Sequence, residues 1–203
     1  LERVMQRVML AVMAVVLALL SFAAAPEQEK SVVYERYDVD IDVQQDGSLR
    51  VTETYQLRFQ GEFHTGFAEI PLDNVTDIVN VDVREGTRSY VEAGTGPGTF
   101  SLERGFDAIH VDWEYEPTSG SETRTFSVEY RVLGALWVYP DVDWLAWKAI
   151  PSDRSGIPTE AGRVTIHPPR AVNPEDLVTN ARGAEATIEV TDGQTIVFES
   201  VGA

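Results

Sequence analysis

Histidine is the side chain best suited to proton transfer near neutral pH, and His64 is the histidine of this chain that lies in an irregular segment with acidic neighbours. Glu62 and Glu69 flank it in sequence, and folding could bring Asp141 near. Such a set could activate water in a hydrolase that acts on cell-envelope material. The chain has no Gly-x-Ser-x-Gly nucleophile motif. We therefore expect His64 to order its loop through a hydrogen bond, and we keep the hydrolase as an alternative.

Two groups of carboxylates invite a metal or a glycosidase interpretation. Asp38, Asp40 and Asp42 alternate along one segment, and Ca²⁺ prefers oxygen ligands of this kind. An extended strand would hold them ~6–7 Å apart, so a solvated strand face is the favoured interpretation. Asp141 and Asp143 are too close in sequence to face each other across a sugar, as acid and base must. We predict no metal and no cofactor.

Residues 136–150 form the most aromatic segment of the chain, with Trp137, Tyr139, Trp144 and Trp147. Exposed rings could stack on sugars, so a glycan-binding domain using Trp137, Trp144 or Trp147 is a second alternative. Trp137 and Tyr139 are spaced as on one face of a strand, and aromatic side chains dominate the cores of β-proteins. The spacing therefore favours core packing for this segment, with one exposed tryptophan allowed.

Alternation of apolar and polar residues with a period of two is the main pattern after residue 30. Residues 37–43 and 49–59 show it most clearly, with the turn signal Asp46-Gly47 between them. About nine such strands predict an all-β fold, an antiparallel two-sheet β-sandwich that is immunoglobulin-like in general architecture. The other alternating segments are residues 79–83, 100–102, 109–115, 126–132, 164–166, 186–190 and 195–198.

The segments between these strands carry few regular patterns. Residues 61–72 are expected to be irregular, and residues 141–149 and 174–178 to form short helical turns. A last hairpin is expected to turn at Asp192-Gly193.

Composition and charge restrict the function classes. The formal net charge is −17, which repels the phosphates of nucleic acids and anionic lipid headgroups. The chain contains no cysteine, so thiol catalysis, disulfides and zinc–thiolate sites are excluded. We predict an acidic domain that binds no nucleic acid.

Residues 1–25 have the three parts of an export signal. Arg3 and Arg7 precede an uncharged apolar run, which ends in small residues at positions 23–25. The run of about 18–20 residues could also remain as an anchor helix that spans the bilayer. The segment predicts either a cleaved signal peptide or an uncleaved N-terminal anchor, and an exported protein in both cases.

Several segments, in this order and spacing, resemble the domain-of-unknown-function family 2207 of predicted membrane proteins. They are Tyr37-x-Val39-x-Ile41-x-Val43, Asp46-Gly47-Ser48-Leu49-x-Val51-x-Glu53, Phe59-x-Gly61-x-Phe63-His64 with Ile70-Pro71, Val138-Tyr139-x-Asp141-x-Asp143-x-Leu145-x-Trp147-Lys148-x-Ile150, and Ile157-Pro158 with Val164-x-Ile166-x-x-Pro169. The resemblance implies a prokaryotic protein with a signal peptide, an extracytoplasmic β-sandwich and then transmembrane helices. It implies no activity, so no functional residue is carried over.

Together these observations predict a β-sandwich domain over residues 31–203, cut at its C-terminal end before a membrane region. We expect a non-catalytic binding or structural module on the extracytoplasmic face of the cell membrane. Its partner would be a protein or an envelope component. Membrane association would come through residues 1–25 or through the missing C-terminal region.

Overall fold

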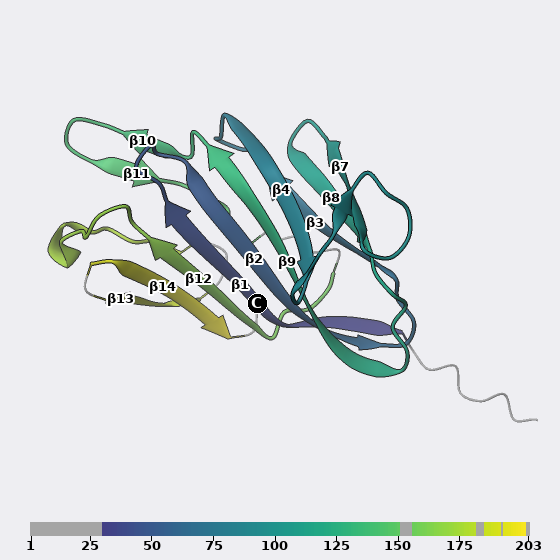
Figure 1. The fold of residues 1–203 in the computed structure, drawn as a ribbon. Coiled ribbons are helices and arrows are strands. Elements are labelled where there is room, and N and C mark those ends of the chain that lie inside the picture. The colour runs from purple at the N-terminus through teal and green to yellow at the C-terminus, as the bar shows by residue number, and fades with distance from the viewer. Residues whose placement is uncertain (1–29, 151–155, 182–184, 192, 202–203) are drawn as a thin grey trace, which may run out of the picture.

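The computed structural model describes residues 30–150, 156–181, 185–191 and 193–201, and these residues form strands, turns and a single turn of 3-10 helix (Figure 1). The all-β prediction is confirmed. The prediction for residues 1–25 lies outside the described residues.

An eight-stranded sheet forms the larger layer of the molecule (Figure 1). Its order from edge to edge is β13 (Thr187–Thr191), β14 (Thr195–Val201), β12 (Ala161–His167), β1 (Ser31–Val43), β2 (Leu49–Gln60), β9 (Ser121–Leu133), β4 (Asp77–Glu85) and β5 (Arg88–Ser89).

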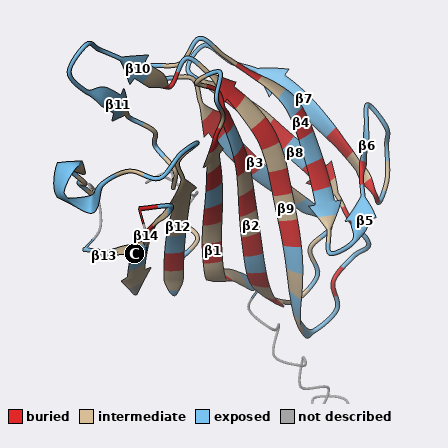
Figure 2. Ribbon diagram, turned by 60° about the vertical axis from the view of Figure 1, so that its left-hand side comes forward, coloured by how far each residue is buried: buried red, intermediate tan, exposed pale blue. Residues whose placement is uncertain are grey.

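Two smaller sheets complete the fold. One has four strands, in the order β3 (Thr65–Pro71), β8 (Ala108–Glu114), β7 (Thr99–Arg104) and β6 (Val91–Glu92). The other is a hairpin of β10 (Leu136–Val138) and β11 (Asp143–Leu145), which projects beyond the larger sheet (Figures 1 and 2).

Alternate residues of the larger sheet point into a core that it shares with the four-stranded sheet. Figure 2 shows this as buried stripes that cross β1, β2 and β9. The Trp113 side chain of β8 lies between the two sheets. The centroid of its ring is 6.1 Å from that of Tyr55 and 5.6 Å from that of Phe126. The two sheets therefore pack face to face through large aromatic side chains.

The hairpin predicted at Asp46-Gly47 is confirmed. The carboxylate of Asp46 accepts a hydrogen bond from the backbone N–H of Ser48, 3.1 Å away, and Gly47 has a φ of 80°. Only glycine adopts this left-handed conformation at little cost. The turn therefore fixes the register in which Val43 faces Leu49.

The sheets are mixed, whereas the prediction was wholly antiparallel. β1 pairs with β12 in parallel, and so does β6 with β7. Strands β2 to β11 intervene between β1 and β12, so no hairpin forces these two strands to run in opposite directions.

Two local predictions were wrong. The supposedly irregular residues 61–72 contain strand β3, whose Ala68 and Ile70 point into the core. The sequence did not reveal this strand, because Gly66 has no side chain to contribute to the alternation of apolar and polar residues. A Cβ atom at Gly66 would lie 2.4 Å from the Trp113 ring. Residues 141–149, predicted as a helical turn, contain strand β11.

The second predicted helical turn is confirmed as a 3-10 turn, η1 (Pro174–Asp176). The last hairpin, β13 with β14, is also confirmed, although Asp192 of its predicted turn lies outside the described residues.

Candidate functional site

The hairpin β10–β11 exposes its aromatic side chains. Trp137 and Trp144 are 49% and 60% exposed, and they lie directly opposite each other in the pairing of the two strands. Directly paired residues point to the same face of a sheet, so the two indoles form one surface. Tyr139 and Val142 extend the apolar area at the turn. We call Trp137, Tyr139, Val142 and Trp144 the hairpin patch.

This exposure corrects the prediction that Trp137 and Tyr139 belong to the core. The spacing did identify a strand, β10, but the side chains of Trp137 and Tyr139 are both about half exposed. Trp147, the third tryptophan of the glycan-binding alternative, is half-buried, with its ring 6.4 Å from that of Tyr130. Trp147 therefore belongs to the base of the hairpin and not to its exposed patch.

The base of the hairpin is anchored in the protein body. Ala135 is fully buried, and Leu136, Leu145 and Trp147 pack against the core. Leu136 also lies beside the β1–β2 turn, since a Cβ atom at Gly47 would be 3.7 Å from its Cδ2. Anchoring on both strands holds the hairpin patch in place, which lowers the entropy cost of binding.

A buried carboxylate, Glu53, occupies the middle of the core. It lies on the central strand β2 and is 2% exposed. Tyr37 and Tyr55 donate hydrogen bonds to its Oε2 and Tyr130 donates one to its Oε1. Three strands, β1, β2 and β9, are thereby joined through one side chain.

Burial raises the pKa of Glu53, and the hydrogen bonds from Tyr130, Tyr37 and Tyr55 oppose that shift. Burial also raises the pKa of each of these tyrosines far above the usual range, with the charge of Glu53 adding to it. The tyrosines therefore stay protonated and act as donors. Sequence reasoning missed this group, although Glu53 stands at an apolar position of an otherwise regular alternation.

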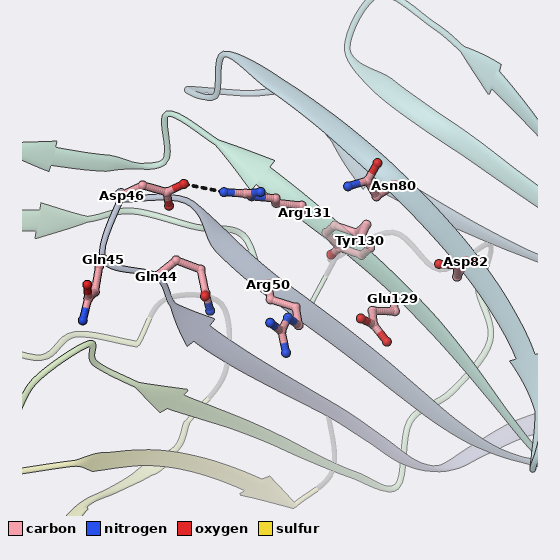
Figure 3. Close-up of a pocket in the computed structure, with 9 residues that line it drawn as sticks. All are labelled: Gln44, Gln45, Asp46, Arg50, Asn80, Asp82, Glu129, Tyr130 and Arg131. Atoms are coloured by element: carbon pink, nitrogen blue, oxygen red, sulfur yellow. Dashed lines mark hydrogen bonds and ion pairs between the residues drawn. The ribbon is translucent and has the colours of Figure 1, made fainter.

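The outer face of the larger sheet carries an open depression of about 580 Å³ (Figure 3). Charged and polar side chains line it, among them Asp46, Arg50, Asn80, Asp82, Glu129 and Arg131. Arg131 is bound to the carboxylate of Asp46, and its Nε donates to the Ser48 hydroxyl at 2.9 Å. Hydrogen bonds from Ser48 lower the pKa of Asp46, so the acid of this pair is ionised at neutral pH.

His64 is exposed in the loop between β2 and β3, and Asp141 is exposed on the hairpin. Within the described residues, the His64 side chain has no hydrogen bond or ion pair; its backbone carbonyl accepts a bond from the Tyr115 N–H at 2.9 Å. Glu69, a predicted partner of His64, instead lies 3.1 Å from Nδ1 of His110. The structure therefore does not bring His64 and Glu69 together.

Asp38, Asp40 and Asp42 lie on the outer face of β1, as their alternation predicted. Asp38 is engaged by Arg36, whose Nε lies 2.6 Å from its Oδ2. Partial burial raises the pKa of Asp40, while His167 opposes the shift. Among the described residues, no group of three or more His, Cys, Asp or Glu side chains is arranged to hold a metal ion.

The chain belongs to a family of unknown function. The family described as Predicted membrane protein (DUF2207) N-terminal domain matches residues 33–201. This confirms the resemblance inferred from the sequence motifs. In the part of the chain that the structure describes, no helix has the length and apolar character needed to cross a bilayer. No curated protein matches the chain in sequence.

Solved structures with similar strand arrangements are distant. A candidate nutrient-binding protein of Legionella pneumophila is 10% identical with a TM-score of 0.47, over 85% of this chain and 62% of that one. A candidate protease of Parabacteroides distasonis is 14% identical with a TM-score of 0.41, over 85% and 36%. A zinc metallopeptidase of Deinococcus radiodurans is 13% identical with a TM-score of 0.39, over 86% and 40%. The chain spans less than two thirds of each, and no function is taken from them.

Proposed function

We propose that this chain is a non-catalytic binding module on the extracytoplasmic face of a prokaryotic cell membrane, and that it docks on an envelope component through the hairpin patch. The observation that carries the proposal is the exposure of Trp137 and Trp144 on one anchored hairpin. Contiguous exposed apolar side chains are costly in water and mark interaction surfaces. The export signal predicted in residues 1–25 and the family's description as membrane proteins support the location.

A glycan is the envelope component that the hairpin patch fits best. Indole rings offer flat apolar surfaces on which the C–H faces of sugars can stack, and the carboxylates of Asp141 and Asp143 next to them can accept hydrogen bonds from hydroxyl groups. A neutral polysaccharide is favoured over an acidic one, because the net charge of −17 repels acidic polymers. A protein partner is the competing occupant.

A sandwich of immunoglobulin-like general architecture is the fold that we propose to carry this hairpin, and the two facing sheets support it. The hydrolase alternative, with His64 as its base, has less support because His64 and Glu69 do not meet. It stays a prediction, and turnover of ester, peptide or glycoside substrates that is lost in a His64→Ala variant would establish it.

Co-sedimentation tests the proposed function. The chain is incubated with purified chitin, cellulose and cell-wall sacculi, and the pelleted fraction is compared with that of a Trp137→Ala/Trp144→Ala variant. We expect the variant to lose at least about tenfold in affinity, because each indole contributes an aromatic contact worth about 1 kcal/mol or more. Phe106→Ala is the matched control, since Phe106 is a fully exposed aromatic residue outside the hairpin.

Binding that survives the double variant, or that Phe106→Ala weakens equally, would contradict the docking role of the hairpin. Absence of binding to all three polysaccharides, together with a specific protein complex that the double variant abolishes, would favour the protein partner over the glycan.

A further inference from the structure

The depression on the outer face of the larger sheet is bounded by two structural irregularities. The β1–β2 turn with Asp46 forms one side, and a β-bulge in β4 forms the other (Figure 3). At the bulge, Asn80 and Val81 lie opposite the single residue Tyr130, and exposed Asn80 adopts a φ of 56°. Bulges redirect side chains and bend a strand, so this one shapes the wall of the depression.

Inside this depression, residues of like charge lie opposite each other on neighbouring strands. Arg50 lies directly opposite Arg131 in the pairing of β2 with β9, and Asp82 lies directly opposite Glu129 in that of β4 with β9. Like charges in direct cross-strand positions destabilise a sheet. The sequence therefore keeps two unfavourable pairs next to each other, where exchanging one member of each would have produced two favourable ones.

The charges of the depression are also incompletely paired. Arg131 is bound to Asp46, but Arg50, Asp82 and Glu129 have no ion pair within 4.0 Å in the described part of the chain. Asp42 lies across from Arg50 on β1 and is the nearest acid in the pairing register. A free cationic group and two free carboxylates thus face one solvent-filled space.

The distance between the acidic and basic groups limits which ligands can bind both. Glu129 and Arg131 are two residues apart on one face of β9, so the acidic and basic rows are separated by about 6–7 Å. We infer that the depression binds a small zwitterion whose opposite charges are separated by a similar distance. Asp82 and Glu129 would bind its ammonium group and Arg50 its anionic group. A dipeptide has this spacing, and so, approximately, does the phosphoethanolamine headgroup of a lipid.

Isothermal titration calorimetry with small probes tests this inference. The probes are glycylglycine, phosphoethanolamine, and, as separate halves, acetate and methylammonium. We expect at least one of the two zwitterions to bind at least tenfold more tightly than either half, because only a zwitterion satisfies both rows. Stronger binding of glycylglycine would indicate a peptide source, and stronger binding of phosphoethanolamine a lipid headgroup.

Variants locate the binding. Arg50→Gln and Glu129→Gln should each weaken binding of the preferred zwitterion at least tenfold. Arg163→Gln is the matched control, since Arg163 is an exposed arginine of the same sheet on β12, where its cross-strand neighbours are Asp38 and Glu199. It should change binding less than twofold.

Three results would overturn the inference: no heat of binding from either zwitterion at 10 mM, halves that bind as tightly as the zwitterions, or an equal effect of Arg163→Gln. The hairpin patch plays no part in this test. The Trp137→Ala/Trp144→Ala variant should bind the zwitterion normally, so this inference and the docking role of the hairpin can fail separately.

Discussion

A buried acid on the inner face of the larger sheet and two acids on its outer face are bonded in opposite ways. On the inner face, Glu53 is buried and accepts hydrogen bonds from three tyrosine hydroxyl groups. On the outer face, Asp82 and Glu129 lie opposite each other, without an ion pair to any described residue. A carboxylate that accepts hydrogen bonds from several protein groups stabilises the fold. Two carboxylates that lie opposite each other without ion-pair partners lower the stability of the fold and are available to bind a ligand. The distinction depends on how each carboxylate is bonded and not on burial alone.

The comparison is tested most strongly by removing each acid in turn. Glu53→Ala should lower the free energy of unfolding by about 3–5 kcal/mol, because it leaves three buried hydroxyl groups without an acceptor and opens a cavity. Glu129→Ala should change it by less than about 1 kcal/mol. Urea denaturation at neutral pH measures both values.

Tyr130→Phe is the control for the inner face, since it removes one hydroxyl group and keeps the aromatic packing on Trp147. It should cost less than Glu53→Ala, about 1–2 kcal/mol. If Glu53→Ala proved as mild as Glu129→Ala, the tyrosine cluster would not hold β1, β2 and β9 together.

The pH dependence of stability provides the next test. Burial raises the pKa of Glu53 in the folded state, so the folded protein binds its proton more tightly than the unfolded chain does. The stability from this group is therefore fully present below the unfolded pKa, near 4.5, and is lost as the pH rises through the folded pKa. Denaturation at a series of pH values from 4 to 8 should show this decrease in the wild type.

Glu53→Gln supplies the reference for that series, since it has no carboxyl group to titrate. The difference in unfolding free energy between wild type and Glu53→Gln should fall with rising pH across this window. A difference that stays constant would mean that Glu53 has the same pKa in the folded and unfolded chains.

Much of the inner face could be predicted from the sequence, because its residues follow a period of two that the strand geometry imposes. The same alternation places Glu53 inside, since Val51 and Tyr55 flank it at apolar positions. The hairpin patch could not be predicted in this way. Trp137 and Tyr139 have the spacing of a buried face, and whether such a face is covered depends on where other sheets lie. Nor could the sequence predict that Arg50 lies opposite Arg131, because this depends on the register of strands that are distant in sequence.

The smallest expected effect concerns the outer face and has the opposite sign. Glu129→Gln should raise the free energy of unfolding by about 0.2–1 kcal/mol, because it removes the repulsion from Asp82. Any lost negative charge relieves a chain of net charge −17 to some extent, so a control is needed. Glu189→Gln serves, because the cross-strand neighbour of Glu189 is uncharged Val197. A gain in Glu129→Gln beyond that of Glu189→Gln measures the local repulsion, and thermal unfolding at low ionic strength, where charges are least screened, resolves it best. Equal increases in the free energy of unfolding would mean that Asp82 and Glu129 do not repel each other appreciably. The proposal that these acids lower stability in order to bind a ligand would then have no physical basis.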